Sequence, residues 1–158
     1  MMLSIAGIFF LSMLIINVNK GTGNRITELV SNESVIYATA LAEGTFEEIQ
    51  SRAFDEETVS KPCSLASDLT GVFSLGEDGS ENATNKSTFD DIDDFDNYTG
   101  TDTSNGMGDF DYRIDVYYVE EASPETDSSS RTFLKRVRVA IANQYLPSTL
   151  IFYRLISY

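Results

Sequence analysis

The first nineteen residues of the chain carry no charge, and this feature constrains the fold more than any other part of the sequence. Only Ser4, Gly7 and Ser12 interrupt the apolar run from Met1 to Ile16. A helix of this length, at about 1.5 Å per residue, covers roughly the hydrocarbon thickness of a bilayer. The run is apolar on every side, unlike a helix that lies on a core with one face in water. We therefore expect residues 1–23 to insert into a membrane.

The sequence around this segment leaves its processing open. A cleavable secretory signal has a basic start and a small-residue cleavage site, and neither is visible here. The segment is either an N-terminal anchor or the part of a precursor that follows a removed leader. The first basic residues, Lys20 and Arg25, come after the apolar run.

Apolar residues then recur at helical spacing and predict an amphipathic helix over residues 24–54. These residues are Ile26, Leu29, Val30, Ile36, Tyr37, Ala40, Leu41, Ile49 and Ala53. If this helix continues the N-terminal segment, the whole element is about fifty residues and near 75 Å long. Gly21 and Gly23 would be a weak point between its halves.

The negative charge is concentrated in the middle of the chain. Residues 77–127 hold sixteen acidic and two basic residues, whereas the rest of the chain holds nine of each, so the net charge of −14 comes from this stretch. Within it, residues 76–110 are rich in Gly, Ser, Asn, Thr and Asp, which favour turns and loops. We expect a long surface connection there.

Three later runs predict antiparallel strands, the first two because apolar and polar residues alternate and the third because it is β-branched and aromatic. They cover 111–119, 131–142 and 149–156 within the segment 111–158. One face of the sheet would carry Tyr112, Ile114, Val116, Tyr118, Phe133, Val137, Val139 and Ile141. Because that apolar face needs a partner layer, the predicted fold is α+β. It has a long N-terminal helix, whose apolar half over residues 1–23 protrudes. The amphipathic half packs on a small antiparallel sheet, and the two together form a globular domain of residues 24–158.

Composition excludes several classes of function. A charge of −14 repels polyanions, so nucleic acid is not an expected partner. The chain has no histidine and one cysteine, Cys63, which rules out imidazole catalysis, Cys/His zinc sites and an internal disulfide. Glu43, Glu47 and Glu48 are interpreted as a solvated helix face, so we expect no enzyme activity. Cys63 is either a small buried residue or a thiol that pairs with another chain.

Two local motifs occur on this plan. The first is Ala40-Leu41-Ala42-Glu43 with Phe54-Asp55-Glu56, and the second is Phe89-Asp90-Asp91-Ile92-Asp93-Asp94-Phe95. Together with the helix-and-sheet plan, they resemble the type IV pilins and the pseudopilins of type II secretion, in particular minor pilins of the mannose-sensitive haemagglutinin type. The chain departs from the family at Ile5, where pilins usually carry the glutamate that meets a neighbour's N-terminal amine. The leader that ends in glycine is also absent.

The resemblance implies a structural subunit of a type IV pilus-like or type II secretion-like filament. Such a subunit starts in the bacterial inner membrane, with a methylated N-terminus, and moves to a periplasmic or cell-surface filament. Its partners would be other copies or other pilin-like subunits. The residues expected to mediate assembly are Met1, Ile5, Ile8, Phe9 and Leu14. The loss of the glutamate favours a minor or pilin-like subunit over a major one. The alternative is a single-span anchored extracytoplasmic domain that binds calcium or another ligand without polymerising.

Five aspartates within seven residues form the candidate metal site: Asp90, Asp91, Asp93, Asp94 and Asp96. Carboxylates this close repel one another, and Ca²⁺ accepts six to eight oxygen ligands in flexible geometry. The spacing does not fit an EF-hand, so a site here would be an irregular loop. A solvated acidic loop is the competing interpretation.

Overall fold

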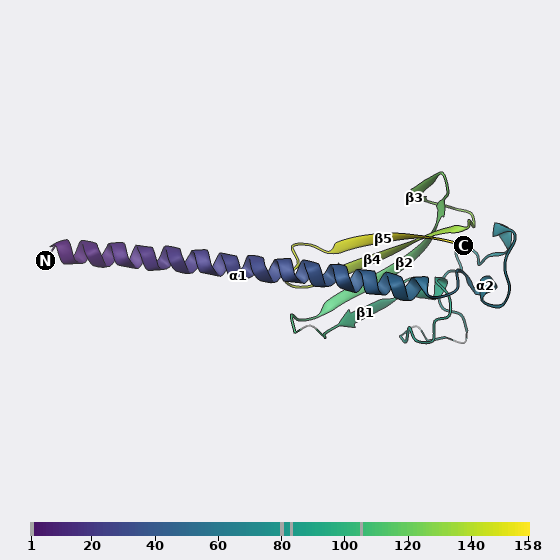
Figure 1. Cartoon of the computed structure of the whole chain (residues 1–158), viewed down its shortest axis with the longest axis horizontal. Helices are drawn as coiled ribbons and strands as arrows, with labels where there is room; N and C mark the ends of the chain where they lie inside the picture. The colour runs from purple at the N-terminus through teal and green to yellow at the C-terminus, as the bar shows by residue number, and fades with distance from the viewer. Residues whose placement is uncertain (1, 80, 83, 105) are drawn as a thin grey trace.

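The computed structural model describes residues 2–158 except residues 80, 83 and 105, and it leaves the side chains of residues 2–12 and 14–24 undescribed. One helix, α1 (Met2–Gln50), runs through both glycines of the expected weak point. Its N-terminal part extends beyond the rest of the molecule, and its C-terminal part lies across a sheet (Figure 1). A short helix α2 (Glu56–Ser60) and two 3-10 turns, η1 (Ala66–Asp68) and η2 (Asp93–Phe95), precede the sheet.

The sheet is antiparallel and confirms the predicted α+β class. Its strands are β1 (Thr99–Asp102), β2 (Phe110–Glu120), β3 (Ser123–Asp127), β4 (Leu134–Ala142) and β5 (Leu150–Ser157). The order is β1-β2-β4-β5, and β3 pairs with the far end of β2. The three predicted strands correspond to β2, β4 and β5. In contrast, β1 lies in the stretch expected to be a surface connection, and β3 lies in an expected turn.

The amphipathic helix forms, and Tyr37, Leu41 and Ile49 of the predicted face pack on the core, but other members of that face are exposed. The residues of α1 that are buried are Ser34, Ala38, Ala42, Thr45, Phe46 and Ile49. Ile26, Leu29 and Ile36 are instead 57%, 67% and 71% exposed. The buried face has small residues from Ser34 to Ala42, which let the backbone approach the sheet closely, and large residues at Phe46 and Ile49. Helical periodicity alone does not tell which of two apolar stripes is covered.

The helix also ends four residues before the predicted boundary at residue 54. The Ala53 N–H donates to the Asp90 carbonyl at 3.1 Å, and the Ile92 N–H donates to the Ala53 carbonyl at 3.0 Å. This bridge draws the chain out of the helix and sets it beside the acidic motif. Asp55 then caps α2 in a capping box with Thr58.

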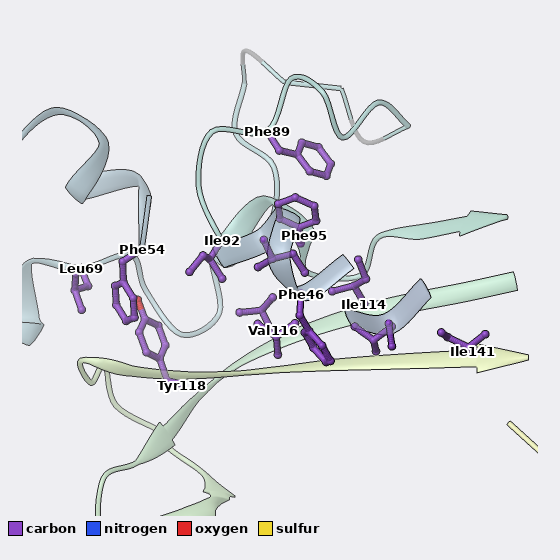
Figure 2. Close-up of a cluster of buried hydrophobic side chains, with 14 of the residues drawn as sticks. Phe46, Phe54, Leu69, Phe89, Ile92, Phe95, Ile114, Val116, Tyr118 and Ile141 are labelled. Atoms are coloured by element: carbon purple, nitrogen blue, oxygen red, sulfur yellow. The ribbon is translucent and has the colours of Figure 1, made fainter. Parts of the chain in front are cut away.

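Aromatic and branched side chains from the helix, the acidic motif and the sheet form one core. Figure 2 shows Phe46, Ile92 and Phe95 gathered near Ile114 and Val116 of β2. Cys63 is buried at the margin of this core. The buried location matches one of the two interpretations of this cysteine.

The predicted membrane segment, residues 1–23, lies outside the described side chains except for Met13. Among the parts of the chain that are described, no helix is both long and apolar enough to cross a membrane.

Candidate functional site

The acidic motif folds inward because its apolar residues belong to the core. Phe89, Ile92 and Phe95 are at most 1% exposed, and the rings of Phe89 and Phe95 meet edge to face with centroids 5.0 Å apart. Their burial carries neighbouring carboxylates into the protein. Asp91 and Asp93 are at most 1% exposed. The five aspartates are therefore not a uniformly solvated loop.

Asp91 and Asp94 hold the turn together by reciprocal hydrogen bonds. The Asp93 and Asp94 N–H groups donate to Asp91 Oδ1 at 2.6 and 3.1 Å. The Asp90 and Asp91 N–H groups donate to Asp94 Oδ2 at 3.0 and 3.1 Å. Asp91 Oδ2 is buried and has no hydrogen-bond partner among the described residues. Burial, together with the nearby charges of Asp93 and Asp94, raises the pKa of Asp91 to about 8.

The side chain of Asp93 contacts a buried amine. Lys135 of β4 is fully buried, and its Nζ donates to Asp93 Oδ1 at 2.5 Å and to Asp55 Oδ2 at 2.8 Å. Its third donor contact is to the Phe54 carbonyl at 2.7 Å. The rings of Phe54 and Tyr118 flank the amine, with centroids 4.5 and 4.9 Å from Nζ. One lysine thus joins the end of the helix segment, the acidic motif and the sheet.

Of the two aspartates that bind this amine, Asp55 accepts more hydrogen bonds. Its Oδ1 accepts from the Thr70 N–H and the Thr70 hydroxyl, both at 2.9 Å. Its Oδ2 accepts from the Tyr118 hydroxyl at 2.5 Å as well as from Lys135. Burial acts to raise the pKa of Asp55, but Lys135 and these donors outweigh it and lower the pKa to about 2. Asp55 is therefore ionised throughout the physiological range.

Asp93 has the opposite character. Its Oδ2 is buried without a hydrogen-bond partner among the described residues. Burial raises the pKa of Asp93 to about 7, although Lys135 opposes the rise. Of the two carboxyl groups that share the amine, Asp55 is thus ionised, whereas Asp93 carries a proton for much of the time at neutral pH.

A signal for this buried cluster was present in the sequence. In the alternating run of β4, residues of odd number face the core, and Lys135 falls between Phe133 and Val137 at an inward position. A lysine there demands buried acidic partners. Asp55 was marked only by its motif, and no sequence pattern indicates that it reaches Lys135.

The other aspartates have separate partners. Asp96 Oδ1 accepts the Val116 N–H at 2.9 Å and so fastens the loop to β2. Asp90 is exposed, and with Asp94 and Glu81 it forms a group whose carboxylate oxygens lie within 4.8 Å of one another. Of the five predicted ligands, only Asp90 and Asp94 belong to this group. Glu81 was not predicted, because it lies nine residues before Asp90 with no pattern that connects them.

Glu81 is held against the acidic motif by a backbone contact. Its Oε1 accepts the Asp90 N–H at 3.1 Å. Burial and a hydrogen bond with Asp94 raise the pKa of Glu81 to about 7. Three clustered carboxyl oxygens match the hard-cation preference of Ca²⁺.

The arrangement supports structural chemistry better than turnover. The amine and its two acids lie inside the core, so a dissolved substrate does not reach them. The predicted assembly residues Met1, Ile5, Ile8, Phe9 and Leu14 fall among the positions whose side chains are not described. Compared with protein-family models, curated proteins and solved structures, the chain gives no match.

Proposed function

We propose that this chain is a structural subunit of a pilus-like or pseudopilus-like filament, built through its N-terminal helix. The observation that carries the proposal is the single helix α1, which extends past the sheet (Figure 1) and is uncharged over residues 2–19. A helix of this kind is first solvated by inner-membrane lipid. In the filament, helices of other copies or of other pilin-like subunits replace that lipid.

A second observation supports the same role. Ile26, Leu29 and Ile36 are exposed, and at about 100° per residue they fall within roughly 80° of one another on α1. Ala38 and Ala42 face the sheet from the opposite side of the helix. The three exposed residues, which we call the outer stripe, continue the apolar character of the N-terminal segment along the globular domain. Neighbouring helices in a bundle would cover this stripe.

The subunit is proposed to be a minor or pilin-like one. If Met1 is the mature N-terminus, Ile5 occupies the place where the resembling family carries its assembly glutamate. A subunit without that carboxylate lacks the charge pair with a neighbour's N-terminal amine, so it suits an initiating or terminal position better than the repeating shaft. The proposed role is not enzymatic.

The test separates filament material from membranes. Cells that produce the chain are sheared without detergent, and the sheared material and the membranes are probed for it. We expect the chain in sheared filaments, at low abundance, and in the inner membrane. Recovery from membranes alone, in cells that do assemble filaments, contradicts the proposal. The N-terminal residue and its methylation state, read from the same material, report on prepilin-type processing.

The second candidate is an anchored domain that binds calcium without polymerising. The carboxylate group of Glu81, Asp90 and Asp94 favours it. Titration of the detergent-solubilised chain with Ca²⁺ would give heat that Glu81→Gln and Asp90→Asn abolish and that Glu28→Gln, an exposed helix acid, does not change. Absence of heat at millimolar calcium would leave the group as a surface feature.

A further inference from the structure

A primary amine and two carboxyl groups meet inside the core, and the side chain that carries the amine is fully buried. Lys135 Nζ lies 2.5 Å from Asp93 Oδ1 and 2.8 Å from Asp55 Oδ2. The two aspartates lie on separate segments of chain, and neither is near Lys135 in sequence. The fold therefore brings together an amine and carboxyl groups, from which an amide can form, although these residues are far apart in the sequence.

We propose that Lys135 and Asp93 condense into an intramolecular amide that joins η2 to β4. The inference does not depend on how the chain assembles. Asp93 is the carboxyl group that reacts, because its Oδ2 is buried with no partner among the described residues. The loss of an oxygen from that carbon costs no hydrogen bond to Oδ2. Asp55, in contrast, uses both oxygens to accept several donors.

The reaction balances with the groups at hand. The Asp55 carboxylate takes a proton from the Lys135 ammonium, and the neutral amine attacks Cγ of the Asp93 carboxylic acid. A C–N bond forms, one C–O bond breaks, and the oxygen leaves as water with the acid's own hydrogen and one from the amine. Asp55 ends with the proton it received. No oxidant, reductant or further reactant takes part.

The two acids have the protonation states that these roles require. The pKa of Asp55 is lowered to about 2, so it is ionised beside the ammonium. The low pKa makes the proton transfer itself unfavourable, and the loss of water and of two buried charges drives the reaction forward. Burial raises the pKa of Asp93 to about 7, so its acid form is present at neutral pH. The Tyr118 hydroxyl, 2.5 Å from Asp55 Oδ2, holds that carboxylate in place.

The environment favours the amide over the ion pair. Buried charges pay a desolvation penalty that the neutral amide avoids, and the released water goes to bulk solvent. Because the fold already holds the two groups together, their reaction avoids the entropy loss of a bimolecular encounter. The rings of Phe54 and Tyr118 lie against the amine, with centroids 4.5 and 4.9 Å from Nζ. The product would tie the acidic motif to the centre of the sheet.

The decisive measurement is mass spectrometry of the full chain. We expect an intact mass, under denaturing conditions, that is lower than the sequence mass by one water. Trypsin should then yield a branched product in which residues 87–113 are joined to residues 132–136, because an acylated Lys135 is not cleaved. Dehydration at Asp78-Gly79 also removes water, so the branched product decides. Separate, unmodified peptides from folded protein overturn the proposal, and a link from Lys135 to residues 53–86 overturns the choice of Asp93.

Variants test the roles of the amine and of Asp55. Lys135→Arg keeps a charge but has no nucleophilic amine, and it should show the full mass. Lys61→Arg, at an exposed lysine, should still lack one water. Asp55→Asn should accumulate unlinked chain, since asparagine does not take the proton. A Lys135→Arg chain that still lacks water overturns the proposal, and normal linkage in Asp55→Asn overturns the role given to Asp55.

Discussion

Asp91 is one of three acids, with Asp93 and Glu81, whose raised pKa makes the stability of this protein depend on pH. Its pKa is raised from 3.8 to about 8 by burial and by neighbouring carboxylates. The folded state therefore binds a proton that the unfolded state releases above pH 4. This contribution to stability is complete below that pH and is lost as the pH rises to about 8. We expect the free energy of unfolding to fall across this window, by at most about 1.4 kcal/mol per pH unit for one such group.

The measurement is urea unfolding of the full chain in detergent from pH 5 to pH 8, followed by tyrosine circular dichroism. Asp91→Asn keeps an oxygen for the Asp93 and Asp94 N–H groups but does not titrate, so the slope should flatten. Asp68→Asn, at an exposed position, should leave the slope unchanged. An equal slope in wild type and Asp91→Asn would exclude Asp91 as its source.

Lys135 is expected to be the most costly lysine to replace. Lys135→Met removes the buried amine and leaves Asp55 and Asp93 without their shared partner, which should destabilise the fold by about 3–5 kcal/mol. Lys86→Met removes the partly exposed pair with Glu48 and should cost about 1 kcal/mol or less. Chemical denaturation of both variants makes the comparison. Similar costs for the two would show that the buried cluster contributes little.

At the scale of elements, the helix α1 has two apolar sides with different tasks. Leu29 and Ile36 of the outer stripe are exposed, so Leu29→Glu and Ile36→Glu should leave the circular dichroism and unfolding midpoint of the chain nearly unchanged. Both should reduce incorporation into filaments strongly, because a charge buried among apolar helices has no polar partner. Thr126→Glu, which adds the same charge on β3, is the control.

The strands show which parts of the sheet can be predicted from local sequence patterns. Alternation over β2 and β4 was sufficient to predict these strands and their buried faces, and the β-branched and aromatic residues of 149–156 predicted β5. The short strands β1 and β3 were missed, since a four-residue Thr-Gly-Thr-Asp strand has no apolar face of its own. It exists because β2 offers a ladder of backbone partners, with Thr99 opposite Arg113 and Asp102 opposite Phe110. That partner follows after residues 103–109, so the strand is set by backbone pairing with β2 and not by its own side chains.

For the whole molecule, the plan implies that the globular domain folds without the N-terminal segment. The residues of α1 that cover the sheet begin at Ser34. Deletion of residues 1–23 should therefore give a soluble, folded monomer, measured by light scattering after size exclusion and by thermal unfolding. Aggregated or unfolded material would count against this division of the helix. Full-length chain, which keeps the apolar segment, should require detergent in the same experiment.

Local sequence patterns were enough to predict the α+β class, the long helix and the three main strands. These follow from periodicity and apolar content, which act over a few neighbouring residues. Tertiary structure alone decided which stripe of the helix is covered, where β1 and β3 pair, and what becomes of each acid in the motif. Five similar aspartates acquire different partners because burial and Coulomb interactions depend on groups brought together from distant segments. Lys135 reaches Asp55 and Asp93 across 80 and 42 residues, a distance over which only the fold carries information.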